Sequence, residues 1–444
     1  MKTWLLKYWD RLRSSFWFIP SLMACGAIAL SFITVALDKT VTERWLQAHT
    51  WAYTGGAEGA SLVLSTVAAS MITIAGVVFS MTLVALSLAS SQLGPRLLRN
   101  FMRDTANQVV LGTFVATFVY CLLVLRTVRR ADEVAFVPHL SVTVGVLLAL
   151  VGLGVLIYFI HHVSVSIQTN EAVARVGAEL MEGIERLFPA RDARGNVAGV
   201  PPGRLEQPAQ FDGQPSAIES RSDGYLQIVD VEALTRIAAD SGLVFRLEQR
   251  PGCYLIKGRP LMKAWPGNRV TDQLASRVNA AFVTGTQRTS AQDIEFAIYQ
   301  LVEIAVRALS PGINDPFTAN TCVDRLGSAL CLLATRQTTT PNGVDDKGRL
   351  RVIVKAITFG ELVDAAFDQI RQYGRSSIAV TIRILDTIAL VAGAPLGGDE
   401  RGGLLRQADL IVASARVDLR DSADLRAVED RYRAACSALA GGSQ

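Results

Sequence analysis

The chain has 444 residues, of which 50% are hydrophobic and 19% charged, with a formal net charge of +4 and a mean hydropathy of +0.30. This apolar excess excludes a disordered chain, a small disulfide-stabilised protein and a fully soluble enzyme. The first 165 residues hold only 19 of the 84 charged side chains, 12 of them Lys or Arg. The basic excess therefore lies in the apolar part, which is typical of contact with lipid headgroups and argues against nucleic-acid binding.

Four apolar stretches predict transmembrane helices. Residues 17–37 are uncharged and close to the roughly 20 residues that cross a bilayer. The second span, about 61–90, lies in an uncharged stretch that would reach roughly 55 Å as one helix. It must tilt strongly or continue as a helix beyond the bilayer. The third span is predicted at 107–125 and the fourth at 139–161.

Basic residues predict the orientation of these spans. An even number of spans places both termini on one side, and that side has seven Lys and Arg against five on the other. The positive-inside rule then favours cytoplasmic N and C termini. Cysteines 253, 322, 331 and 436 form no CxxC motif or close pair, as expected in a reducing cytosol.

The part after the fourth span is expected to be cytoplasmic and to contain three segments. Residues 166–215 form a helical extension, to about residue 188, and a linker rich in Pro and Gly. Residues 216–265 form a small α+β module and residues 266–444 a helical domain. The fold class is thus a membrane protein with four transmembrane helices, a cytoplasmic α+β module and an α-helical C-terminal region.

Turn and capping residues predict local structure in this part. Asp223-Gly224, between two strand-like runs at 217–230, predicts a β-hairpin, and Asp230 caps a short helix. Strands are expected at 243–248 and 253–257, around an Arg250-Pro251-Gly252 turn. Ser290 with Asp293 predicts a capping box. Further helices are expected at about 316–336, 356–373, 375–393, 402–416 and 422–440.

The second span carries a polar stripe whose members are spaced alternately by four and three residues, so that they share one helical face. The stripe consists of Thr66, Ser70, Thr73, Val77, Ser80, Val84 and Ser87 and continues to Ser91. In a symmetric oligomer this face could line a water-filled path in which Val77 and Val84 form apolar constrictions. Alternatively, small and hydroxyl residues, with Gly76 beside them, let helices pack closely.

Three arginines follow the stripe in the loop at 94–103. Arg96, Arg99 and Arg103 alternate with apolar residues at helical spacing, which predicts an interfacial segment on lipid headgroups. At the inner mouth of a pore they would favour anions. His161 and His162 close the fourth span, but adjacent helical residues diverge by about 100°. No metal site and no cofactor are therefore expected.

The most distinctive soluble segment is SPGINDP, at residues 310–316. Ser310, Pro311 and Gly312 end one helix, and Asp315 with Pro316 begins the next as N-cap and first helical residue. Asn314 and Asp315 could also bind a ligand or a neighbouring subunit, with Arg288 and Arg307 as charge partners. Both interpretations remain open from the sequence.

Three segments resemble a known family: SSQLGPRLLRNFMRD at 90–104, FIHHVSVSIQ at 159–168 and ALSPGINDPFTA at 308–319. With the four spans, they are similar to the bacterial predicted membrane proteins grouped as domain of unknown function 2254. The resemblance covers nearly the whole chain and implies a bacterial inner-membrane protein. It implies no activity.

Enzyme signatures are absent from the sequence, which has no GxxxxGK[ST], GxGxxG after a strand, HExxH or GxSxG motif. No span holds a charge between its ends, which disfavours pumps. We therefore expect a non-enzymatic protein in the lipid bilayer. The first hypothesis is a homo-oligomeric, channel-like protein that passes an ion or small solute. The alternative is a membrane-anchored scaffold or sensor with a cytoplasmic ligand- or protein-binding module.

Overall fold

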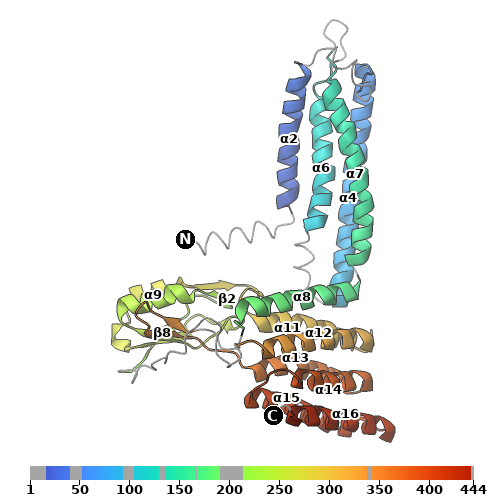
Figure 1. Ribbon diagram of the computed structural model, residues 1–444. Helices are drawn as coiled ribbons and strands as arrows, with labels where there is room; N and C mark the ends of the chain where they lie inside the picture. The colour runs from blue at the N-terminus through green and yellow to red at the C-terminus, as the bar shows by residue number, and fades with distance from the viewer. Residues whose placement is uncertain are drawn as a thin grey trace. The chain divides into compact units, whose positions relative to one another are not determined.

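The computed structural model describes residues 17–40, 53–93, 105–129, 136–166, 168–190, 214–337 and 342–441, without the side chains of 89–93 and 166. The chain divides into two compact units, Met1–Glu171 and Ala172–Gln444. The first is referred to as the helical bundle and the second as the C-terminal unit. Figure 1 labels their elements in chain order.

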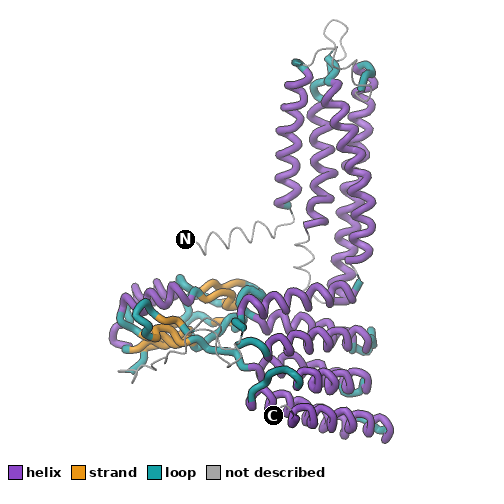
Figure 2. Tube along the Cα trace, viewed as in Figure 1, coloured by secondary structure: helices purple, strands orange, loops and turns teal. Residues whose placement is uncertain are grey.

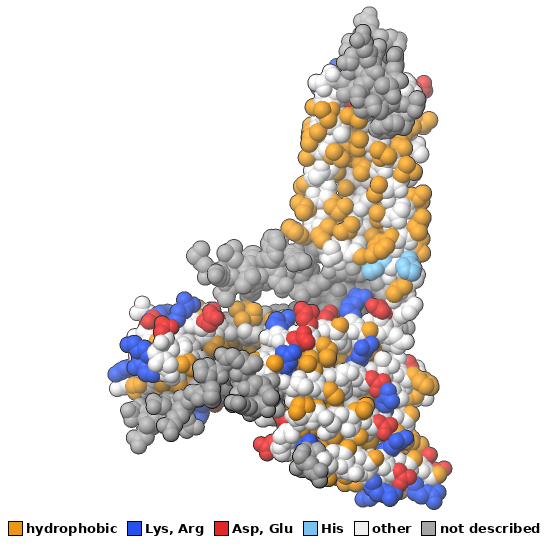
Figure 3. Space-filling model, viewed as in Figure 1, with side chains coloured by type: hydrophobic (Ala, Val, Ile, Leu, Met, Phe, Trp, Pro, Cys, Tyr) orange, Lys and Arg blue, Asp and Glu red, His pale blue; other side chains and the backbone are white. Residues whose placement is uncertain are grey.

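The helical bundle contains four helices that are long and apolar enough to cross a membrane, as predicted. They are α2 (Phe18–Asp38), α4 (Ala57–Leu93), α6 (Thr105–Leu125) and α7 (His139–Ser166). Apolar side chains cover much of the outer surface of these helices (Figure 3). Helix α4 is continuous over 37 residues, so the second span does continue as a helix beyond the length that one crossing needs.

Helix α6 is the most buried helix of the bundle and packs against α2, α4 and α7. Glycines at the helix contacts allow neighbouring helices of the bundle to approach closely. A Cβ on Gly112 of α6 would lie 2.5 Å from Met23 Sδ of α2, and one on Gly145 of α7 would lie 3.2 Å from a Leu64 methyl group of α4. The core of the bundle is therefore set by small residues facing large ones, as in membrane helices generally.

Polar contacts join α2, α6 and α7 at the end where α7 begins. The Asp38 carboxylate accepts hydrogen bonds from Leu140 N (2.8 Å) and from Ser141 N (2.9 Å). Tyr120 of α6 donates to the Ser141 carbonyl (3.0 Å), and its hydroxyl also lies 3.0 Å from Thr34 Oγ1. The last residue of α2 thus caps the free amides at the start of α7, which a helix within a bilayer could not leave unpaired.

The C-terminal unit includes a stack of helices in two columns. Helices α11, α13 and α15 pack on one another in one column, and α12, α14 and α16 in the other. Figure 2 shows the resulting layers. The stack comprises α8 (Thr169–Leu187), α11 (Ile294–Ala308), α12 (Pro316–Ala334), α13 (Phe359–Gly374), α14 (Ile378–Ala392), α15 (Gly398–Asp418) and α16 (Ser422–Gly441).

Helix α8 lies along α11 and α12. A Cβ on Gly177 would lie 3.0 Å from Arg325 Cδ, and one on Gly183 would lie 3.3 Å from an Ile294 methyl group. The capping box expected at Ser290 is wrong, because α11 begins one residue after Asp293, whose carboxylate accepts from Phe296 N (3.1 Å). Asp293 is itself the N-cap, and it is not the third residue of the helix.

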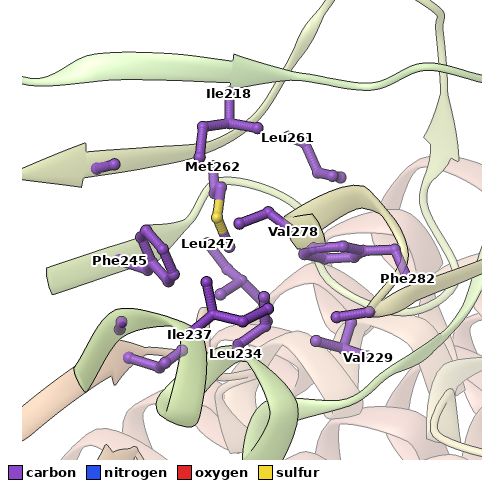
Figure 4. Packing of buried hydrophobic residues seen from close by; sticks show 14 of the residues in the cluster. Ile218, Val229, Leu234, Ile237, Phe245, Leu247, Leu261, Met262, Val278 and Phe282 are labelled. Carbon is purple, nitrogen blue, oxygen red and sulfur yellow. The ribbon is translucent and has the colours of Figure 1, made fainter. Parts of the chain in front are cut away.

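The α+β module holds two small sheets around one apolar core (Figure 4). The five-stranded sheet has the order β1-β5-β3-β8-β7, and the three-stranded sheet has the order β4-β2-β6. The elements are β1 (Ser216–Glu219), β2 (Gly224–Val229), α9 (Val231–Ser241), β3 (Val244–Leu247), β4 (Tyr254–Leu255), β5 (Pro260–Trp265), a 3-10 turn η1 (Gly267–Arg269), α10 (Asp272–Asn279), β6 (Phe282–Gly285), β7 (Gly343–Val344) and β8 (Leu350–Ile353).

The predicted hairpin at 217–230 is wrong, because its two strands lie in different sheets. Strand β1 pairs with β5, whereas β2 pairs with β4 and β6. The chain between them bonds elsewhere: Asp223 Oδ1 accepts from Lys257 N (3.0 Å), and Gly258 N donates to the Ser220 carbonyl (2.8 Å). Strands beyond residue 265 complete the sheets, with β6 beside β2 and β8 parallel to β3.

Candidate functional site

The candidate site is the outward face of α4. All seven predicted stripe residues are exposed on the bundle surface, with Val77 at 53%. The residues of α4 that contact the other helices include Leu64, Met71 and Val78, all buried. At about 100° per residue these lie on the side opposite the stripe. Among the described residues the stripe therefore mediates no helix packing, so the packing alternative requires a partner beyond the described helices of this bundle.

The hydroxyl groups on this face are of two kinds. Thr73 Oγ1 donates to the Ala69 carbonyl of its own helix (2.8 Å), which satisfies the group without a partner helix. Ser70 and Ser80 make no side-chain hydrogen bond to another described residue. Gly76 lies on the same exposed side, and a Cβ added to it would meet nothing within 4 Å. The face therefore carries small side chains at these positions, and the hydroxyl groups of Ser70 and Ser80 are able to hydrogen-bond a partner or water.

The stripe extends past the level of Thr105, the first described residue of the neighbouring helix α6. A Cβ on Gly152 would lie within 3.7 Å of both Met71 and Phe114, so these residues of α7, α4 and α6 share one level. Helices α4 and α6 run in opposite directions, and α6 begins nine residues before Phe114, at Thr105. The matching residue of α4 is Ser80. Counted from this contact, Val84 and Ser87 of the stripe lie beyond the level of Thr105, the first described residue of α6.

The other spans present a different surface. Helix α7 exposes large aliphatic side chains, among them Leu150, Leu153 and Ile157. Such a surface suits lipid chains, which offer no hydrogen-bond partner. Helix α4 also exposes large apolar residues: Ile72, Phe79 and Leu83 on one side of the stripe, Met81 on the other, and Leu62 and Leu88 on the same face as the hydroxyl groups. The outward face of α4 is therefore mixed, with hydroxyl groups between apolar side chains, whereas the named residues of α7 are all aliphatic.

The remaining predicted residues near the bundle are less informative. Arg96, Arg99 and Arg103 lie outside the described residues, as does Ser91 by its side chain. His161 is exposed, and the His162 ring stacks on Tyr158 with centroids 5.5 Å apart. Within the described parts of the chain, no three His, Cys, Asp or Glu side chains gather to hold a metal ion.

The SPGINDP segment forms a tight connection between α11 and α12. Asn314 has a positive φ of 49°, and Ser310 Oγ donates to the Arg307 carbonyl (2.7 Å). Asp315 Oδ1 accepts from Thr318 N (3.1 Å), and its Oδ2 accepts from Thr318 Oγ1 (2.6 Å). The Thr318 hydroxyl, followed by the Thr318 and Phe317 amides, holds the pKa of Asp315 below its usual value. The predicted cap is confirmed.

An open groove of about 370 Å³ runs beside this connection, between α12 and α14. Phe317, the residue after Pro316, is 82% exposed at its rim. Arg383 lies in the groove and forms a two-pronged ion pair with Asp324, with distances of 2.6 and 2.7 Å. The other lining residues are Asn320, Thr321, Ala379, Ile382 and Asp386.

Arg288 is not the charge partner of the SPGINDP segment that was expected from the sequence. Its guanidinium binds Asp293 at the opposite end of α11, with distances of 2.7 and 2.8 Å. Burial alone would lower the pKa of Arg288, but the bonds and charge of Asp293 outweigh it and raise that pKa. Arg307 contacts the segment through its backbone carbonyl, which accepts a hydrogen bond from the Ser310 hydroxyl.

Ion pairs that no sequence pattern predicted join the module to the helices. Arg250 contacts Glu295 of α11 (2.9 Å) and Glu361 of α13 (3.3 Å). Burial opposes the charge of Arg250, yet the two carboxylates raise its pKa overall. Because the partners lie 45 and 111 residues away along the chain, no local pattern could have predicted this cluster.

Comparison with known proteins agrees with the membrane architecture. A sequence model of a family of predicted membrane proteins, DUF2254, matches residues 13–389. Uncharacterized proteins of Mycobacterium bovis and Mycobacterium tuberculosis are each 33% identical to this chain over 429 residues, which cover 94% of this chain and 79% of the relative. No solved structure matches. The resemblance found in the three sequence segments is confirmed.

Proposed function

We propose that this chain, which belongs to the DUF2254 family of predicted membrane proteins, is a channel-like homo-oligomer whose α4 helices line a passive path for an ion or small solute. In this proposal the protein lies in the bacterial inner membrane with cytoplasmic N and C termini, as the basic residues favour. No chemical step, metal or cofactor is involved.

The single observation that carries the proposal is the exposure of the seven stripe residues from Thr66 to Ser87 on the side of α4 opposite its own bundle. Thr73 is satisfied by its own helix, but the hydroxyl groups of Ser70 and Ser80 gain nothing when they face lipid, whereas a second copy or water can hydrogen-bond them. The alternating spacing of four and three residues averages 3.5, the period that keeps one seam of a left-handed helix pair facing its partner. Several copies of α4 could therefore surround one axis.

The level of α6 divides the proposed path into two parts. Thr66, Ser70, Thr73, Val77 and Ser80 lie within the 21-residue length of α6, which is about 31 Å and matches the hydrocarbon core. Val77 is the apolar constriction in this part, where dewetting could gate the path. Val84 and Ser87 would surround an extension outside the hydrocarbon.

Cysteine cross-linking tests the assembly. In full-length protein with Cys25→Ser, Ser70→Cys and Thr73→Cys should form disulfide-linked dimers in native membranes under mild oxidation. Leu150→Cys of α7 and Ile72→Cys on the flank of α4 serve as controls, because both positions are exposed but off the stripe. Equal cross-linking at all four positions, or none at the stripe, would contradict the proposed interface.

Flux through reconstituted protein tests the path itself. Liposomes containing the full chain should pass ions or small solutes under voltage, tension or osmotic downshock. Ser80→Trp should reduce this flux because it fills the stripe, whereas Leu153→Trp on α7 should not. If the assembly cross-links through α4 but shows no flux, the proposed path is contradicted and only the α4 interface is retained.

A membrane-anchored sensor is the second candidate, and the groove beside SPGINDP favours it. The groove combines an exposed aromatic ring with carboxylates and a guanidinium, a mixture suited to a polar small molecule or peptide. Arg383→Ala should abolish such binding without changing flux. A protein that is monomeric in detergent and binds a partner would favour the sensor over the channel.

A further inference from the structure

Strand β4 of the α+β module has an unusual outward face. Its residue Leu255 is buried in the module core, and the side chains on either side of it, Tyr254 and Ile256, point away from the core at 56% and 54% exposure. Tyr254 packs edge-on against Tyr225 of β2, with ring centroids 5.1 Å apart. A sheet face in water normally carries polar residues at such positions, so large apolar residues here indicate that this face contacts another apolar surface.

Two cations follow these apolar residues in a tight turn. Arg259 N donates to the Ile256 carbonyl (3.0 Å), and Gly258, with a φ of +78°, allows the turn. Lys257 and Arg259 are exposed, and neither forms an ion pair with a described residue. The Asp223 carboxylate accepts a hydrogen bond from the backbone amide of Lys257 (3.0 Å) and forms no ion pair with the Lys257 ammonium group. The turn is held in shape while its cations stay available.

Charge is segregated within the C-terminal unit. The module, residues 214–285 and 342–355, has 13 Lys and Arg against 9 Asp and Glu. The helical stack, residues 168–190, 286–337 and 356–441, has 16 against 21. The module is therefore the basic part of a unit that follows directly on the fourth span. An anionic bilayer attracts basic surfaces, and Tyr beside aliphatic residues is typical of the headgroup region.

We propose that the turn from Tyr254 to Arg259 contacts anionic phospholipid headgroups. Lys257 and Arg259 meet the phosphates, and Tyr254 and Ile256 enter the boundary between headgroups and acyl chains, as in interfacial anchors. This contact does not depend on the proposed path through α4. It would tie the α+β module to the bilayer surface and make its position sensitive to lipid charge.

Photocrosslinking of the full chain in lipid nanodiscs tests the contact. A photoreactive residue replaces Ile256, and as a control Val344, which is 40% exposed on β7, an edge strand of the other sheet of the module. The discs contain phosphatidylcholine alone or with one-quarter phosphatidylglycerol. We expect lipid adducts at position 256 to exceed those at 344 in the anionic discs. Adding Lys257→Glu and Arg259→Glu should reduce them by more than about tenfold, since each cation near an anionic surface strengthens the attraction by a factor of roughly five.

A second pair of variants guards against misfolding. Lys257→Arg with Arg259→Lys keeps both charges and should keep the lipid adducts. Equal adducts at 256 and 344, adducts to a second protein chain in place of lipid, or insensitivity to both phosphatidylglycerol and charge reversal would each overturn the proposal. Failure of the flux or of the α4 cross-linking would leave this result unaffected, since neither involves the turn.

Discussion

At the scale of single residues, two carboxylates at helix starts were predicted correctly as caps. Asp230 and Asp315 were expected as N-caps, and each accepts from the backbone amides that follow it. Capping depends on residues two or three positions apart, so the sequence contains the whole interaction. The cap at Asp38 differs, because it serves α7 more than 100 residues away. Sequence spacing could not reveal it.

The Asp315 cap can be tested by removal. Asp315→Ala should weaken the first turn of α12 by about 1 kcal/mol, because two backbone amides lose their acceptor. Amide hydrogen exchange of the full chain should then show roughly fivefold lower protection at Phe317 and Thr318. Asp315→Asn retains an acceptor and is the matched control. Equal loss in both variants would show that charge, and not capping, stabilises the turn.

The same cap predicts a dependence on pH. The pKa of Asp315 is lower in the folded protein than in the unfolded chain, so its stabilisation is complete above about pH 4, the unfolded value. It is lost as the pH falls through the lowered folded pKa. The difference in protection between wild type and Asp315→Ala should therefore narrow below pH 4. A constant difference down to pH 2 would contradict this assignment.

At the scale of elements, the helices follow the sequence closely and the strands do not. Apolar periodicity and caps located the helices of the stack, because each helix satisfies its own backbone. Strands need partners, and the Asp223-Gly224 turn could not show that β1 pairs with β5 instead of β2. The joint between module and stack has the same non-local character, since Arg250 reaches two helices from one turn.

Removing Arg250 should loosen that joint. Arg250→Met leaves Glu295, whose side chain is only 14% exposed, without its counterion and should cost about 2 kcal/mol. Hydrogen exchange in β4 and the start of α11 should rise together. Glu361→Gln changes the more exposed partner while keeping a capping side chain, so it should cost less. If Glu361→Gln is the more disruptive of the two, the joint depends on α13 instead.

The length of α4 leads to a prediction on solvent access. Ser87→Cys lies beyond the level where α6 begins and should react with a membrane-impermeant maleimide in opened vesicles. Ser70→Cys lies within the length of the bundle and should react only if water reaches the stripe. Leu150→Cys of α7 should remain unreactive. Reaction at 87 alone would favour helix packing over a water-filled path, while reaction at neither would place both inside lipid or protein.

At the scale of the whole molecule, the two units have separate cores, and α8 belongs with the second. Its residues Val173, Val176, Leu180 and Ile184 are buried, and Arg186 donates to the Ser290 carbonyl (3.1 Å). Helix α8 is therefore part of the stack, although it follows the fourth span almost directly.

A fragment that begins at Gln168 should consequently fold and remain monomeric in solution. One that lacks α8 should aggregate, because the apolar surfaces of α11 and α12 would lose their cover. Size-exclusion chromatography and thermal unfolding followed by circular dichroism distinguish the two. Equal solubility and melting temperature would show that α8 only connects the units.

The sequence by itself determined the four apolar helices, their number and approximate ends, the helical C-terminal region, the caps and the spacing of the polar stripe. These features depend on composition and on contacts within a few residues. Only the tertiary structure decided that the stripe faces away from its own bundle, that Val84 and Ser87 lie beyond α6, and that β1 and β2 belong to different sheets. The physical reason is that each of these depends on which distant segment covers a given face.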